Sequence, residues 1–218
     1  MSNHSEAMDP QGPPHIHHMD SNTAYHSAKF GMWLFLGTEI LLFGGLFCAF
    51  AIYRWMYLEE YHHASKSLSV ALGATNTVVL LISSYFAAMA VDAAQHGDNK
   101  KVSRNIIITI ICACGFLVIK AIEYSSKYHH GLFPLNAEFN SPEFNEAYRS
   151  FFGLYYCMTG LHALHVIIGM GLLGWVLSKS RKNRFSGRYY TPVELGALYW
   201  HLVDLIWIYL FPLLYLVG

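Results

Sequence analysis

The sequence predicts an all-α integral membrane protein built as a bundle of five transmembrane helices. Hydrophobic residues make up 54% of the chain and charged residues only 13%, whereas a soluble domain usually carries about 25% charged residues. Five apolar runs lie at residues 30–53, 70–91, 106–124, 151–177 and 193–217. Each is long enough to cross about 30 Å of hydrocarbon as a helix. The runs lack strand-like alternation, and in lipid only helices and closed barrels pair all of their backbone groups.

The chain divides into a polar N-terminal tail, residues 1–28, and one five-helix membrane domain, residues 29–218. The tail lacks the basic segment and short apolar core of a signal peptide, so we expect the first helix itself to direct insertion. His15, His17 and His18 could bind a divalent metal there, although a solvated tail is the simpler interpretation. Fourteen Lys and Arg residues balance 14 Asp and Glu residues, so no net field favours nucleic acid as a partner.

Basic residues in the connections predict the orientation of the bundle. With five spans, the N-terminal tail lies on the same side as the second and fourth connections. That side carries nine Lys and Arg residues against four on the other, and cytoplasmic loops are enriched in these residues. We therefore expect a cytoplasmic N-terminus and an external C-terminus. The nine are Lys29, Lys100, Lys101, Arg104, Lys179, Arg181, Lys182, Arg184 and Arg188, and the four are Arg54, Lys66, Lys127 and Arg149.

Glu39 is a carboxylate well inside the first apolar run. At that depth it costs several kcal/mol unless it is protonated, paired or hydrated, which makes it a functional candidate. The alternative is a structural role, in which a protonated Glu39 contacts Thr38 or a neighbouring helix. Charge and depth alone leave both interpretations open.

The third and fourth runs each contain two polar residues spaced three apart. Lys120 and Glu123 share a helix face, and near the outer end of their run we expect an ion pair with partial snorkelling. His162 and His165 also share a face, as ligands of a metal or a haem can. No carboxylate or cysteine on the same stretch completes such a site, so uncharged histidines bonded to lipid headgroups or neighbouring helices are favoured.

The last run carries Glu194, His201 and Asp204. His201 and Asp204 are three residues apart, and an imidazole–carboxylate hydrogen bond between them would relay protons or simply satisfy two buried polar groups. Small residues in the fourth run have a structural interpretation. Gly160 and Gly171 can line one face, where they would let helix backbones approach closely.

Taken together and in chain order, these residues resemble subunit III of the haem–copper respiratory oxidases, the cytochrome c oxidase polypeptide III family. Matching segments lie on successive helices at residues 29–39, 76–83, 123–124, 151–169 and 194–207. The resemblance covers about residues 29–218. The chain resembles the shorter, five-helix bacterial form of the family, because it has no counterpart of the first two helices of the seven-helix members.

The resemblance implies an accessory role in the membrane of a bacterium. Subunit III of this family binds no haem and no copper, which lie with the redox chemistry in subunits I and II. It packs on subunit I, holds structural phospholipids in a cleft between helix groups, and supports proton uptake and turnover lifetime. Subunit II and other small subunits complete the set of expected partners.

Residue by residue, Glu39 matches the family's proton-related buried carboxylate, which reacts with a hydrophobic carbodiimide. The other matching polar positions, inside or at the edge of the membrane, are His162, His165, Glu194, His201 and Asp204. The pair of Lys120 and Glu123 is a departure, because the family usually carries an uncharged glutamine in place of Lys120. We expect no catalytic residue and no metal ligand in this chain.

Other functions are compatible with parts of the pattern. Relatives in the same family serve quinol oxidases or are associated with nitric oxide reductases. A membrane cytochrome would use His162, His165 and His201 as haem ligands, and a small transporter would be centred on Glu39 and the Lys120–Glu123 pair.

Overall fold

The computed structural model describes residues 21–129 and 145–216, and within them the chain forms helices and no β-strand. The helices are α1 (Ser21–Met56), α2 (Leu58–Ser65), α3 (Val70–Gln95), α4 (Asn99–His129), α5 (Glu146–Arg181), α6 (Thr191–Phe211) and the short π-helix η2 (Pro212–Leu216). Five segments are long and apolar enough to cross a membrane: Thr23–Met56, Val70–Gln95, Asn99–Tyr128, Glu146–Arg181 and Thr191–Leu216. The prediction of an all-α bundle with five spanning helices is confirmed.

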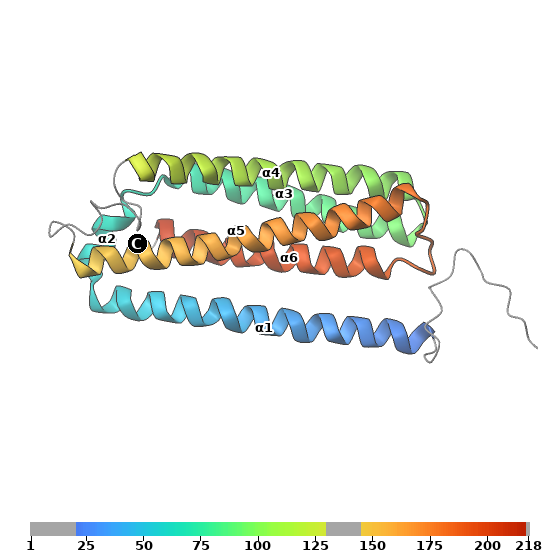
Figure 1. Cartoon of the computed structure of the whole chain (residues 1–218), viewed down its shortest axis with the longest axis horizontal. Helices are drawn as coiled ribbons and strands as arrows, with labels where there is room; N and C mark the ends of the chain where they lie inside the picture. The colour runs from blue at the N-terminus through green and yellow to red at the C-terminus, as the bar shows by residue number, and fades with distance from the viewer. Residues whose placement is uncertain (1–20, 130–144, 217–218) are drawn as a thin grey trace, which may run out of the picture.

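The long helices lie side by side and alternate in direction (Figure 1). α3 and α4 form an antiparallel hairpin that packs against α5 and α6, and α1 lies on the opposite side of α5 and α6. The start of α1, the α3–α4 turn and the α5–α6 connection are at one end of the bundle, and α2 is at the other. The first end therefore gathers the nine basic residues counted from the sequence.

Small side chains on α3 explain how the helices pack. The buried residues of α3 recur every three or four positions and include Gly73, Leu80, Ser83, Ala87 and Ala90, so they form one stripe along the helix. In a membrane no hydrophobic effect favours helix association, and small residues allow close van der Waals packing instead. The exposed apolar side chains of the same helix, such as Val78 and Leu81, suit a surface facing lipid.

Helix α1 extends beyond the predicted apolar run at both ends. It begins at Ser21, about two turns before the predicted boundary at Lys29, so part of the polar tail continues the spanning helix. The histidine cluster at residues 15–18 lies outside the described residues. The short helix α2 was not predicted. Its Tyr61 packs against the rings of Phe50 and Phe151, with centroid distances of 5.4 and 5.2 Å.

Candidate functional site

Glu39 on α1 pairs with His165 on α5. The Oε2 atom of Glu39 lies 2.9 Å from Nε2 of His165, and the two side chains are 14% and 9% exposed. Thr38 does not take part, because its hydroxyl donates to the backbone carbonyl of Phe35. The carboxylate therefore meets a neighbouring helix rather than its own.

The second nitrogen of His165 determines what the pair can do chemically. Nδ1 lies 2.8 Å from the carbonyl oxygen of Leu161, and a carbonyl oxygen only accepts, so Nδ1 carries a hydrogen. Nε2 then either accepts a proton shared by a protonated Glu39 or, as part of an imidazolium, donates to a carboxylate. In both forms the pair is electrically neutral and holds one exchangeable proton between α1 and α5.

A phenylalanine ring and a tyrosine hydroxyl contact His165 of this pair. Phe43 packs edge-on against the His165 ring at a centroid distance of 5.3 Å, and the Tyr199 hydroxyl donates to the His165 carbonyl over 3.3 Å. Phe43 lies one helical turn from Glu39 on α1, and Tyr199 belongs to α6. Three helices thus meet at the site.

Glu194 forms a second tie between α1 and the rest of the bundle. Its Oε1 accepts from Lys29 Nζ at 2.6 Å, and its Oε2 accepts from the Tyr25 hydroxyl at 2.9 Å. Lys29 also donates to the Tyr25 oxygen over 3.1 Å. Glu194 therefore acts as a partner of the first helix at the end where α1 begins.

Lys120 and Glu123 form the expected ion pair, with 2.9 Å between Nζ and Oε2. The expected snorkelling of Lys120 is wrong, since its side chain is only 6% exposed and points among aromatic rings. Nζ lies 4.8 Å from the centroid of the Trp207 ring and 5.3 Å from that of Tyr215. Cation–π attraction and the Glu123 carboxylate together replace the water that a snorkelling ammonium would reach.

A second lysine shares the same carboxylate. Lys127 Nζ is 3.6 Å from Oε1 of Glu123, and the hydroxyls of Tyr155 and Tyr215 donate to that oxygen over 3.1 and 2.8 Å. The sequence predicts a connection at Lys127, which instead lies on α4, and it does not indicate a role for Tyr155 or Tyr215. The four-residue spacing of Glu123 and Lys127 was a usable signal for one helix face; the tyrosines come from α5 and η2 and carried no local signal.

His162 and His165 contact different neighbours despite their three-residue spacing. His162 is fully buried between Phe116 of α4 and Trp207 of α6, with ring centroids at 5.5 and 5.3 Å. Among the described residues neither of its ring nitrogens has a hydrogen-bond partner. The imidazole of His162 is therefore held by aromatic packing, whereas that of His165 has hydrogen bonds as well as its contact with Phe43.

The predicted bond between His201 and Asp204 does not form, so that prediction is wrong. Nδ1 of His201 instead lies 2.7 Å from the hydroxyl oxygen of Ser84 on α3. Asp204 is 5% exposed, and its Oδ1 has no hydrogen-bond partner within the described part of the chain. Packing of α3 against α6 brings a hydroxyl to the imidazole, and the helical spacing alone could not reveal it.

The polar side chains do not converge on one ion. Within residues 21–129 and 145–216, no group of three or more His, Cys, Asp or Glu side chains could hold a metal. Glu39 with His165, Glu123 with Lys120 and Lys127, and Lys29 with Glu194 form three separate ionic groups along the bundle. His201 contacts Ser84, and His162 packs on the Trp207 ring that also lies 4.8 Å from Lys120 Nζ.

Comparison with known proteins gives one consistent result. The model of the family described as cytochrome c oxidase subunit III matches residues 14–218. The chain is 32% identical to cytochrome c oxidase subunit 3 of Thermostichus vulcanus over 187 residues, 85% of each chain. It is 32% identical to the protein of the same name from Synechocystis over 206 residues, 94% of this chain and 80% of the relative. Quinol oxidase subunit 3 of Bacillus subtilis is 29% identical, with 86% of each chain covered.

Proposed function

The chain belongs to the cytochrome c oxidase subunit III family, and from this premise we propose that it packs on subunit I of a haem–copper terminal oxidase and supports proton uptake there. Its relatives are named as subunits of cytochrome c oxidases and of quinol oxidases, and an accessory role fits both. In this proposal haem and copper reside in subunits I and II, and this chain contributes protein and lipid contacts around them.

The observation that carries the proposal is the pair of Glu39 and His165. A carboxylate inside a spanning segment is costly without a partner, and here the partner is an imidazole that shares one exchangeable proton with it. The Glu39 side chain keeps 14% of its surface exposed, so the proton is not sealed inside the bundle. An adjoining subunit that covers this face could exchange protons with the pair.

The rest of the arrangement suits a subunit that is anchored by lipid and by its neighbours. α1 is joined to the other helices by Glu39 and Lys29 and exposes many apolar side chains, among them Trp33 and Leu41. Such a face suits structural phospholipids or a membrane-embedded partner. The nine basic residues at the end where α1 begins support a cytoplasmic N-terminus and an external C-terminus in a bacterial cytoplasmic membrane.

A membrane cytochrome is less well supported by the geometry. A haem with two histidine ligands needs two free imidazole nitrogens that converge on one iron. Both nitrogens of His165 have partners, and Nδ1 of His201 bonds Ser84. His162 has free nitrogens but lies between Phe116 and Trp207.

Purification in mild detergent tests the proposed partnership. A tagged chain should bring down a haem-bearing subunit I, and the chain separated from it should show no stoichiometric haem or copper spectrum. A tightly bound haem in the separated chain would reject the accessory role.

Deletion and substitution test the mechanism. Without this chain, the oxidase should keep its initial rate of electron transfer and inactivate after fewer turnovers. Glu39→Leu should reproduce part of that loss because it removes the shared proton. Glu59→Gln, at an exposed position on α2, is the matched control and should retain wild-type endurance. Equal endurance of the Glu39→Leu oxidase and wild type would refute the proposed role of the pair.

A further inference from the structure

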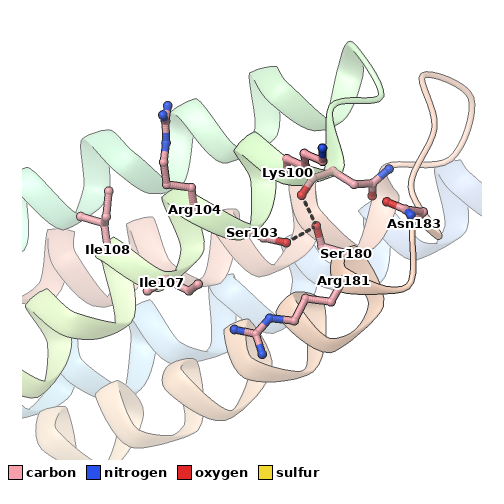
Figure 2. A pocket seen from close by; sticks show the side chains of 9 residues that line it. Lys100, Ser103, Arg104, Ile107, Ile108, Ser180, Arg181 and Asn183 are labelled. Atoms are coloured by element: carbon pink, nitrogen blue, oxygen red, sulfur yellow. Dashed lines mark hydrogen bonds between the residues drawn. The ribbon is translucent and has the colours of Figure 1, made fainter.

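A basic pocket lies between the first turns of α4 and the last turn of α5, at the end of the bundle where α1 begins. Its volume is about 530 Å³, and its lining includes Lys100, Ser103, Arg104 and Ile107 from α4 and Ser180 and Arg181 from α5. Figure 2 shows the two serines between the helices and the basic side chains around them. None of these residues belongs to the site of Glu39 and His165.

The wall of the pocket is held by hydrogen bonds among its own polar groups. Ser103 donates to the Ser180 oxygen over 3.0 Å, and Ser180 donates to the backbone carbonyl of Asn99 over 2.8 Å. The Asn99 amide donates in turn to the Phe185 carbonyl over 2.8 Å. These bonds fix α4, α5 and the connection after α5 relative to one another, so the pocket is preformed.

The cations of the pocket lack counter-charges. Lys100, Arg104 and Arg181 are exposed, and within the described part of the chain none of them forms an ion pair. In Figure 2 the guanidinium groups of Arg104 and Arg181 extend away from each other, and both side chains are exposed and long enough to reorient toward a ligand. The pocket has no carboxylate in its lining.

Carboxylates nearby at this end of the bundle have partners of their own. Asp98 pairs with Lys101 at 3.2 Å and Glu194 with Lys29 at 2.6 Å. Three positive charges around one preformed wall therefore remain available to an anion.

Two isoleucines make one side of the pocket apolar, and the residues around it are those that occur at membrane surfaces. Ile107 and Ile108 line it one turn beyond Arg104, and Ile111 on the next turn is 63% exposed. On α5, Lys179 Nζ sits 4.0 Å from the ring centroid of Trp175. Exposed tryptophan and lysine near the end of a spanning helix mark the headgroup region.

We propose that this pocket binds an anionic glycerophospholipid, with the phosphate between Arg104 and Arg181 and an acyl chain along Ile107 and Ile108. The planar guanidinium group donates two parallel hydrogen bonds to phosphate, and basic pockets between spanning helices on the cytoplasmic side bind lipid headgroups. Free phosphate would use the charges but not the isoleucine wall. A zwitterionic lipid would bring an ammonium group among three cations.

This inference deepens the lipid-binding part of the proposed function by giving the lipid class and its place. It rests on the membrane location of the chain and not on proton uptake. Loss of lipid binding in a complex that still contains subunit I would count against this pocket alone, whereas absence of subunit I would count against the proposed function.

Native mass spectrometry of the purified complex tests the pocket, with dioctanoyl-phosphatidylglycerol, dioctanoyl-phosphatidylcholine and inorganic phosphate as probes. Wild type should bind one phosphatidylglycerol at least about tenfold more tightly than phosphatidylcholine. The double variant Arg104→Gln/Arg181→Gln should lose about 30-fold in affinity for phosphatidylglycerol, at roughly one kcal/mol for each basic residue. Its affinity for phosphatidylcholine should not change.

The matched control is Lys182→Gln/Arg188→Gln, which removes two charges at the same end from residues that do not line the pocket. It should bind phosphatidylglycerol as tightly as wild type does. If this control loses as much affinity as Arg104→Gln/Arg181→Gln, the lipid is attracted by the overall positive charge of this end, and the proposal is overturned. Competition by inorganic phosphate at the same concentration would also overturn it. If the double variant fails to assemble, the wild-type complex alone tests the proposal. Equal affinities of wild type for phosphatidylglycerol and phosphatidylcholine would then contradict it.

Discussion

Lys29 on α1 and Glu194 on α6 are 165 positions apart in sequence, and 2.6 Å separates Nζ from Oε1. Ten residues further along α1, Glu39 reaches His165 on α5. At about 1.5 Å per residue the two ties are roughly 15 Å apart along the helix axis. α1 is thus attached to the bundle by polar side chains at two levels along its length.

Removing the Lys29–Glu194 tie should weaken α1 modestly. The two side chains are 36% and 17% exposed, so water screens the pair, and we expect a coupling energy of about 0.5–1 kcal/mol. A double-mutant cycle with Lys29→Met and Glu194→Gln, read by chemical unfolding in detergent, measures it. Lys182→Met serves as the control for loss of one charge at the same end. A coupling energy of zero at low salt would show that the ion pair does not hold α1.

Substitution of Glu123 should cost more than substitution of either lysine beside it. Glu123→Gln leaves Lys120 and Lys127 as two buried ammonium groups without a counter-charge, and we expect a loss of about 3–5 kcal/mol. Lys120→Gln keeps Lys127 and two tyrosine hydroxyls on the carboxylate, so about 1–3 kcal/mol should be lost. Chemical unfolding in detergent measures the loss of stability in each variant, with Lys66→Gln on the surface as control. A smaller loss for Glu123→Gln than for Lys120→Gln would contradict this arrangement of charges.

The fold and part of the polar network could be predicted from the sequence because both depend on local patterns. Apolar runs give spanning helices whatever their partners, and the spacing of Lys120 and Glu123 places both on one face of the same helix. The pairing of Glu39 with His165 could not be predicted in this way. It depends on how α1 packs against α5, which five similar apolar helices do not encode in their periodicity.

The wrong predictions also arose because the packing of one helix against another cannot be read from spacing within a helix. His201 and Asp204 have a spacing that permits a bond, yet Ser84 from another helix takes the imidazole nitrogen. Gly160 and Gly171 were expected to let helices approach, but a Cβ at either position would meet nothing within 4 Å. Gly169 is the glycine of α5 that lies against a neighbour. Spacing restricts which residues share a face and leaves open which face meets which helix.

The turn between α3 and α4 gives a prediction about pH. The backbone N–H of Lys101 donates to Asp98 Oδ1 over 3.1 Å, and its ammonium lies 3.2 Å from Oδ2. These two contacts, the backbone bond first, hold the pKa of the Asp98 carboxyl below its usual range. A group whose pKa is lower in the folded state stabilises above its unfolded pKa, and the stabilisation is lost as pH falls through the folded value.

Asp98→Asn should therefore be less stable than wild type at pH 7 and equally stable once the Asp98 carboxyl is protonated, well below pH 4. The amide can still accept from the Lys101 N–H at the start of α4, so the variant removes the charge and keeps the cap. Melting temperatures of wild type and Asp98→Asn, measured from pH 7 to below pH 4, test this expectation. A difference that stays constant down to pH 3 would mean that the charge is not the cause.

Two glycines on α5 offer a matched test of helix packing. A Cβ added at Gly169 would lie 2.9 Å from Cε3 of Trp200, whereas one added at Gly171 would meet nothing within 4 Å. Trp200 cannot easily move, because its ring is fully buried and its Nε1 donates to Ser83 over 3.0 Å. Gly169→Ala should thus overpack the α5–α6 interface and cost about 1–3 kcal/mol.

Gly171→Ala should be neutral or stabilise α5 by up to about 1 kcal/mol, since alanine has the higher helix propensity. Both variants add one methyl group to the same helix two residues apart, so the difference between them isolates the contact with Trp200. Chemical unfolding of the two proteins in the same detergent measures it. Equal stabilities would mean that α6 can shift away from α5 without loss, and the close packing of these helices around His165 would then not be needed to hold the site.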